Sequence, residues 1–170
     1  MKKSAVIYRS KYGSTLQYAR WIAEELGAEL IEQTQVPVSA LQEFELIVYG
    51  GGVYGGKVRG LDILHNAKCR NVIVFTVGLE DPAKAGYGKM EEEIHSHKGL
   101  ERAKIFHLRG AMEFKRLRPF DKRAVSWVMK AHKNPSEIKE IDRLTAPEAK
   151  LDFITPQAVQ PIVDYAKSLS

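Results

Sequence analysis

The sequence predicts an α/β protein built on a doubly wound sheet of five parallel strands. Short continuous apolar runs, typical of strands buried on both faces of a parallel sheet, end in polar or glycine-rich loops. Segments with helical spacing of apolar residues separate these runs. The chain has 170 residues, of which 44% are hydrophobic and 28% charged, so we expect one buried core and a single domain over residues 1–170.

The first helix has the clearest pattern, because Leu16, Ala19 and Ile22 recur on one face and Gly27 is placed to end it. The expected strands, in chain order, are 5–8, 28–32, 46–49, 72–75 and 103–108. After the first helix, the expected helices are 57–67, 87–97 and 156–169. In such a sheet, ligands bind beyond the carboxyl ends of the strands.

An insertion is expected at about 109–154, since some 45 residues separate the fifth strand from the last helix where a few would suffice. Within it, Pro119 is placed to begin an amphipathic helix. Its apolar face would hold Phe120, Ala124, Trp127, Val128 and Ala131. We expect this face to be buried on the domain, or the helix to meet an anionic membrane or a carboxylated substrate.

The net charge of +5 is concentrated in this insertion. Residues 109–133 contain eight Lys or Arg against two acidic residues, so the rest of the chain is close to neutral. With only Trp127 and Phe120 among the basic residues, a nucleic-acid-binding role is disfavoured.

The loop after the first strand, residues 10–15, has the composition of a phosphate-binding loop. It leads into a helix, whose first N–H groups and dipole attract anions. Ser10, Ser14 and Thr15 would donate hydrogen bonds, and Gly13 would let the chain turn close to the anion. The alternative is that Ser14 only caps the helix and the other hydroxyls are solvated.

Two further loops follow the next strands at the same rim. The segment from Gly50 to Gly56 has five glycines around Tyr54, more than a plain turn needs, so its backbone would approach a flat ligand on which Tyr54 stacks. Residues 76–80 end the next strand. Three loops of this kind predict a site for one nucleotide-like cofactor.

The ordered motifs SKYGST, GGGVYGGK and TVGLE resemble the flavodoxin-like family, and nearly the whole chain is covered. The segment HLRGAMEFKRL and the basic helix resemble the insertion of the menaquinone-dependent protoporphyrinogen dehydrogenase group. The resemblance implies strand order 2-1-3-4-5 and noncovalent FMN without a metal. It implies that residues 10–15 cradle the phosphate, 51–56 line the isoalloxazine and 76–79 cover its pyrimidine end. The implied cofactor residues are Ser10, Lys11, Tyr12, Gly13, Ser14, Thr15, Gly51, Gly52, Val53, Tyr54, Gly55, Gly56, Thr76, Val77, Gly78 and Leu79.

By this resemblance the protein is an FMN-dependent dehydrogenase, an oxidoreductase that passes electrons from a small-molecule donor to a quinone or similar acceptor. The alternative is a flavodoxin-type electron carrier for a redox protein partner, which the pI near 9.2 weakens because carriers of this type are usually acidic. Tyr12 also departs from the threonine common in flavodoxins. A cofactor-free binding module is a minor alternative. The spacing G-x-x-x-x-G-K at 51–57 is followed by Val58 instead of the hydroxyl that a nucleotide-hydrolysing loop needs.

The remaining chemically reactive residues are assigned ordinary roles. His95 and His97 are expected at the surface and Cys69 near the core, without a metal. His107 and Arg109 end the fifth strand near the rim, where they could touch substrate. The N-terminus has no signal-peptide pattern, so we expect a cytoplasmic protein, with peripheral membrane contact through residues 115–133.

Overall fold

The structure of the protein is a computed structural model that describes residues 3–83, 85–131 and 146–169. It contains two compact units. The first comprises Met1–Gly110 and Ile154–Ser170, and the second comprises Ala111–Phe153. That the two units form a single domain over residues 1–170 stays a prediction.

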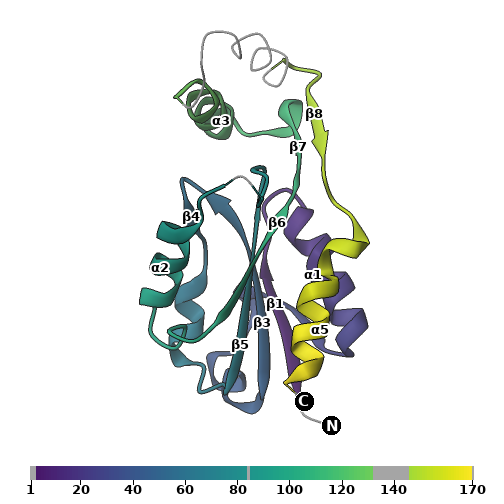
Figure 1. Ribbon diagram of the computed structural model, residues 1–170, viewed down its shortest axis with the longest axis vertical. Helices are drawn as coiled ribbons and strands as arrows, with labels where there is room; N and C mark the ends of the chain where they lie inside the picture. Colours follow the sequence, from purple (N-terminus) through teal and green to yellow (C-terminus); the bar gives the residue numbers. More distant parts are fainter. Residues whose placement is uncertain (1–2, 84, 132–145, 170) are drawn as a thin grey trace. The chain divides into compact units, whose positions relative to one another are not determined.

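The first unit contains the predicted parallel sheet (Figure 1). Its strands lie in the order β2-β1-β3-β5-β6. The short strand β4 was not predicted and pairs only with the last residues of β3. Counted without β4, the five parallel strands have the predicted order 2-1-3-4-5. The bounds are β1 Ser4–Arg9, β2 Glu29–Glu32, β3 Leu46–Tyr54, β4 Lys57–Val58, β5 Asn71–Gly78 and β6 Lys104–Arg109.

Helices cover both faces of this sheet. Helices α1 (Ser14–Leu26) and α5 (Gln160–Ser168) lie on one face, and α2 (Gly88–Ser96) lies on the other (Figure 1). Short 3₁₀ helices complete the unit: η1 Gln33–Gln35, η2 Val38–Glu43, η3 Leu61–Asn66 and η6 Pro156–Val159. Each face buries its own core, one around Val48 and Phe75 and the other around Ile47 and Val74, as strand alternation requires.

The predicted helix at 57–67 is wrong. Gly55 and Gly56 both have positive φ, as a two-residue hairpin turn requires, so the chain reverses into β4. Gly60 also has a positive φ of 85°, and a Cβ there would lie 2.3 Å from the Tyr49 hydroxyl oxygen, so a regular helix cannot pass through it. The chain after Gly60 forms only the 3₁₀ helix η3.

The predicted loop at 50–56 is also wrong over most of its length, since β3 continues to Tyr54. The glycines at its start are required by packing within the sheet. A Cβ on Gly50 would lie 2.1 Å from the Phe75 ring, so the ring occupies the space that a side chain would need.

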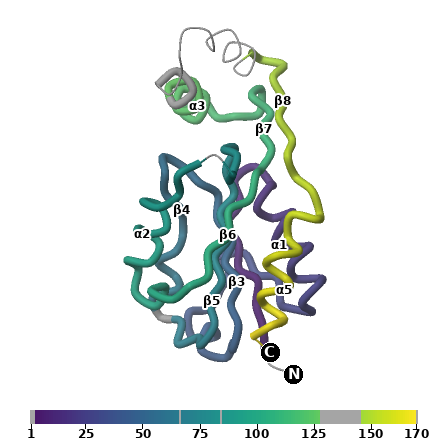
Figure 2. The backbone as a smooth tube through the Cα atoms, in the orientation of Figure 1, coloured from purple at the N-terminus to yellow at the C-terminus, as the bar shows by residue number. Residues whose placement is uncertain are grey.

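The second unit contains a two-stranded antiparallel sheet of β7 (Ala111–Glu113) and β8 (Lys150–Asp152), the 3₁₀ helix η4 (Phe114–Arg116) and helix α3 (Pro119–Ala131). The chain enters it after β6 and returns through β8 to α5 (Figure 2). The predicted start of the helix at Pro119 is confirmed.

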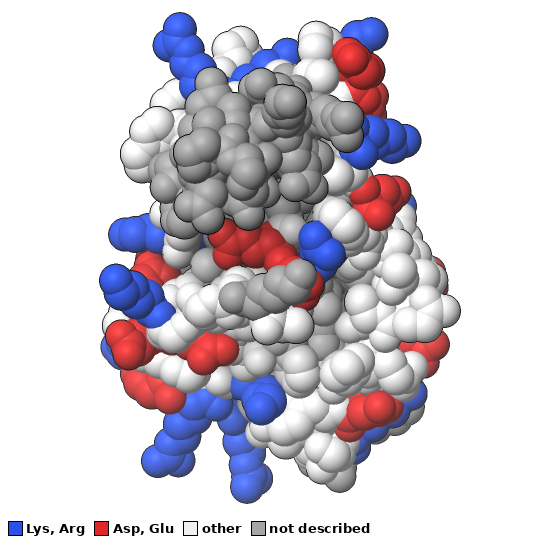
Figure 3. All heavy atoms as spheres, turned by 45° about the horizontal axis from the view of Figure 1, so that its top comes forward, with Lys and Arg blue, Asp and Glu red and all other residues white. Residues whose placement is uncertain are grey.

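The two aromatic residues on the predicted apolar face of α3 have large exposed fractions, and the expectation that this face packs on the domain stays a prediction. Phe120 is 79% exposed and Trp127 is 71% exposed. Figure 3 shows Lys and Arg interspersed with Asp and Glu among the described side chains. Lys133, the last residue of the predicted basic segment, lies outside the described residues. None of the helices in the described ranges combines the length and apolar character needed to cross a bilayer.

Candidate functional site

The predicted site segments follow strands that are neighbours in the sheet. Arg9 at the end of β1 pairs in register with Gly51 of β3, and Gly52 pairs with Val77 of β5. Because these strands are parallel, their carboxyl ends meet at one edge of the first unit. The fold therefore brings the three segments together, as the sequence predicts.

The first segment ends at the N-terminus of α1. Gly13 is the N-cap residue, with φ 100°, and a Cβ on it would meet nothing within 4 Å. Its N–H donates to the Ser10 hydroxyl at 3.0 Å, which folds the loop into a turn. Thr15 is buried at 4% exposure. Since the first turn of α1 contains no acidic residue, its dipole favours an anion such as a phosphate group, and these residues fit FMN.

The second segment is a hairpin rather than an open loop. The Tyr54 ring lies near two cations, with Lys11 Nζ 5.4 Å and Arg59 Cζ 5.2 Å from its centroid. These contacts connect the hairpin to the first segment. Arg59 was not among the predicted site residues, because a basic residue in a glycine-rich segment is by default solvated.

Two of the predicted hairpin glycines are covered by neighbouring side chains. A Cβ on Gly51 would lie 2.5 Å from Val58 Cγ1, and one on Gly52 would lie 2.8 Å from the Tyr54 ring. By contrast, a Cβ on Gly55 or Gly56 would meet nothing within 4 Å. The open side of this segment is therefore the hairpin turn itself.

The third segment belongs to β5 as far as Gly78, so the side chains of Thr76 and Val77 are buried, at 1% and 7% exposure. The backbone beyond them is fixed to the end of β6. The Gly78 carbonyl accepts from the Gly110 N–H at 2.7 Å, and the Leu79 carbonyl accepts from the Arg109 guanidinium at 3.2 and 3.3 Å. This segment therefore offers a cofactor its backbone groups and the partly exposed Leu79 side chain.

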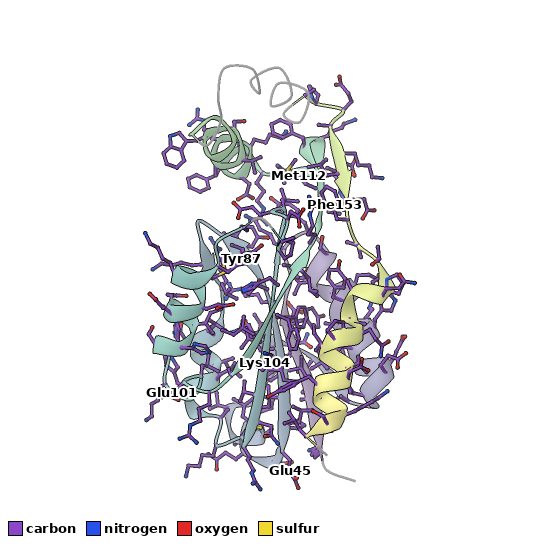
Figure 4. The ribbon with its side chains drawn as sticks, in the orientation of Figure 1. Glu45, Tyr87, Glu101, Lys104, Met112 and Phe153 are labelled. Atoms are coloured by element: carbon purple, nitrogen blue, oxygen red, sulfur yellow. The ribbon has the colours of Figure 1, made fainter. Side chains whose placement is uncertain are left out.

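His107 joins this segment to helix α2. Its Nδ1 lies 2.7 Å from Thr76 Oγ1, and its Nε2 lies 2.9 Å from Glu91 Oε1. The His107 ring stacks on Tyr87, with centroids 3.7 Å apart and an interplanar angle of 11°. Tyr87 lies at the N-terminal end of α2 (Figure 4). Burial raises the pKa of its phenol, and the negative charge of Glu80 raises that pKa further.

These contacts show a structural role for two residues whose contact with substrate stays a prediction. His107 and Arg109 do lie at the end of the last parallel strand, but both bind the third segment and hold it in place. The network of Thr76, His107 and Glu91 was not predicted, because its members are far apart in the sequence. Their pairing depends on the β5–β6 register, in which Thr76 lies beside His107.

A cavity of about 420 Å³ lies beside the hairpin. Tyr54 is the one predicted cofactor residue in its lining. The other lining residues are Arg9, Lys57, Val58, Arg59, Gly60, Leu61, Asp62, Glu93 and His97. Three of its lining residues are arginine or lysine from β1, β4 and the turn after β4, so this part of the cavity suits an anionic group.

Solved flavoproteins are similar to this chain at low identity. A flavodoxin from the domain Archaea has 17% identity and a TM-score of 0.47, over 86% of this chain and 96% of that one. A flavoprotein in complex with FMN from Lactobacillus acidophilus NCFM has 17% identity and a TM-score of 0.46, over 64% and 93%. A WrbA-like flavodoxin from Agrobacterium tumefaciens has 19% identity and a TM-score of 0.43. That match covers 49% of this chain and 64% of the Agrobacterium protein.

No curated protein sequence matches the chain. The family described as Flavodoxin domain matches residues 5–139, which include all three predicted site segments and continue into the second unit. This match confirms the predicted fold class, and membership of this family supports the predicted cofactor FMN. The protoporphyrinogen dehydrogenase group is a finer assignment than the match provides. Together with the doubly wound sheet and the N-terminus of α1 at its carboxyl edge, the match establishes that the chain belongs to the flavodoxin-domain family.

Proposed function

We propose that the protein is a redox protein that holds FMN at the carboxyl edge of its parallel sheet. The observation that supports this most directly is the N-terminus of α1, where Gly13 leaves open space beside a helix end without acidic residues. Such a helix end stabilises a phosphate through its first N–H groups and its dipole. The hydroxyls of Ser10, Ser14 and Thr15 add donors.

The other two segments would hold the ring system of the cofactor. The hairpin at 51–56 presents its turn and the Tyr54 ring, and the backbone at 78–79 presents peptide groups that Arg109 and Gly110 keep in place. FMN, when bound, supplies transfer of one or two electrons. The protein residues bind the phosphate, orient the ring and limit the access of water.

The experiment that tests this proposal compares FMN with riboflavin, which lacks the phosphate. We expect FMN to bind with 1:1 stoichiometry and riboflavin to bind far more weakly. A hydrogen bond to a charged group contributes about 1.5–3 kcal/mol, so Thr15→Ala should weaken FMN binding about tenfold to a hundredfold. Affinity is measured by quenching of flavin fluorescence.

Thr34→Ala is the matched control, because Thr34 is exposed on η1, outside the three segments. It should leave FMN affinity unchanged. Equal affinities for FMN and riboflavin would show that residues 10–15 do not bind the phosphate.

Within this function we favour a dehydrogenase that passes electrons to a quinone-like acceptor over a carrier for a protein partner. The support is the basic charge of the segment 109–133 and the exposed Phe120 and Trp127, which differ from the acidic docking surface of a typical carrier. A dehydrogenase should turn over with an organic donor, such as a reduced porphyrin precursor, and a quinone. A carrier should stay oxidised until a reductase is added.

A further inference from the structure

A cluster of metal-ligating side chains lies in the first unit, and none of its members belongs to the three cofactor segments. It consists of Asp62, His65 and His97. We propose that these three residues bind a divalent transition-metal ion of the zinc class. This departs from the sequence-based expectation of a protein without a metal, because the sequence gives no sign that His65 and His97 come together.

The local fold explains why these residues meet. Asp62 and His65 are three residues apart on η3, and in a 3₁₀ helix residues at this spacing share one face. His97 is the residue that ends α2. A Cβ on Gly99 would lie 3.3 Å from the Leu64 carbonyl oxygen, so the turn after α2 is held close to η3.

The distances within the cluster suit one metal ion. His65 Nε2 lies 3.1 Å from His97 Nδ1, and Asp62 Oδ1 lies 3.8 Å from the first nitrogen and 3.7 Å from the second. A point equidistant from three atoms with these separations is about 2.1 Å from each, which matches the Zn–N and Zn–O distances of about 2.0–2.2 Å.

A second carboxylate orients one of the proposed ligands. His97 Nε2, the ring nitrogen that does not face the cluster, lies 3.4 Å from Glu93 Oε1. In metal sites a ligating histidine commonly donates its other N–H to a carboxylate, which fixes the ring and raises the basicity of the ligating nitrogen. The other carboxylate oxygen, Glu93 Oε2, is buried with no hydrogen-bond partner in the described part of the chain.

The chemistry of the ligands selects the class of ion. Two imidazole nitrogens and one carboxylate oxygen suit zinc and its neighbours, whereas magnesium and calcium prefer oxygen ligands. Solvent reaches the cluster, because the Asp62 side chain is 83% exposed and the cavity beside the hairpin is lined by Asp62 and His97. Three protein ligands leave a fourth tetrahedral position for water.

Binding would replace the hydrogen bond between the two histidine rings. For both nitrogens to donate lone pairs to the ion, the proton between them moves to the other nitrogen of its own ring by exchange with solvent, so that both imidazoles stay neutral. The ion would then join η3 to the end of α2. The expected consequence is a gain in the stability of the folded chain, which does not depend on the flavin.

The test is zinc binding to the FMN-free full chain, measured by calorimetry and by thermal unfolding, with magnesium as the negative control. We expect one zinc per chain. At a zinc concentration one hundred times Kd, the midpoint of unfolding should rise by about 5–10 °C. Cobalt should give the visible absorption of a tetrahedral site.

Variants identify the ligands. Glu93→Gln should weaken zinc binding about tenfold to a hundredfold, and His65→Ala and His97→Ala should weaken it more than that. His95→Gln is the matched control, since His95 is adjacent on α2 but contacts the Ala103 carbonyl instead, so its zinc-dependent shift should persist. Absence of zinc binding in the wild-type chain, or binding that survives both histidine-to-alanine substitutions, would overturn the proposal. Because the readout is independent of flavin, either result leaves the proposed redox function standing.

Discussion

Replacing Thr76 with valine should destabilise the protein, although the two side chains have almost the same shape. The Thr76 side chain is 1% exposed and its hydroxyl lies 2.7 Å from His107 Nδ1. The His107 side chain is itself only 10% exposed, so after the substitution its Nδ1 has little access to water. A buried polar group left without its partner costs about 1–3 kcal/mol.

The expected change is measurable by thermal unfolding. For a chain of this length, 1 kcal/mol corresponds to about 2–4 °C, so Thr76→Val should lower the midpoint by about 2–12 °C. His107→Phe is the second variant, because phenylalanine keeps a ring for Tyr87 to stack on while removing both nitrogens. The double variant Thr76→Val/His107→Phe completes a thermodynamic cycle.

In the double variant, residue 107 has no ring nitrogen, so the loss of the Thr76 hydroxyl leaves no buried nitrogen without a partner. The two effects should therefore be less than additive, with a coupling of about 0.5–3 kcal/mol in urea unfolding. If they add to within about 0.5 kcal/mol, Thr76 and His107 do not interact in solution and the network is not a support of the third segment.

Three further changes have definite expected outcomes. Gly50→Ala places a Cβ against the Phe75 ring and should cost about 1–3 kcal/mol in urea unfolding, whereas Gly86→Ala, with open space around it, should stay within about 0.5 kcal/mol. Burial raises the pKa of the Cys69 thiol, so its thiolate fraction at pH 7.5 is small. Alkylation of Cys69, followed by mass spectrometry, should therefore be slower than alkylation of glutathione and should accelerate only at higher pH. Tyr54→Ala should lower FMN affinity while the flavin-free chain still folds cooperatively, and unchanged affinity would exclude Tyr54 as a flavin contact.

The sequence was sufficient to predict the sheet and most helices, because their signals are local. Apolar runs such as 46–49 and 72–75 lie inside β3 and β5, and Gly27 ends α1 in the left-handed conformation. The helix predicted at 57–67 failed for a reason that spacing does not reveal. Gly60 has a positive φ, and a side chain there would strike the Tyr49 hydroxyl, a contact that only the folded sheet creates.

The predicted site was correct in placing three segments at one edge, but many of its side chains have structural partners. Thr76 binds His107, Val77 is in the core, and the Ser10 hydroxyl accepts from Gly13 within its own loop. Which hydroxyl is used for packing and which for a ligand depends on register and burial. The sequence contains neither.

The glycines of β3 show why composition alone overstates a binding site. Gly50 and Gly51 are in positions where a Cβ would strike Phe75 and Val58, so selection for packing accounts for both without any ligand. Gly55 and Gly56 have positive φ and open surroundings, which a hairpin turn explains but which also leave backbone free to approach a flat ring. A ligand contact is therefore expected at the turn of the hairpin, whereas the strand glycines before it let β3 pack closely against Phe75 of β5 and Val58 of β4.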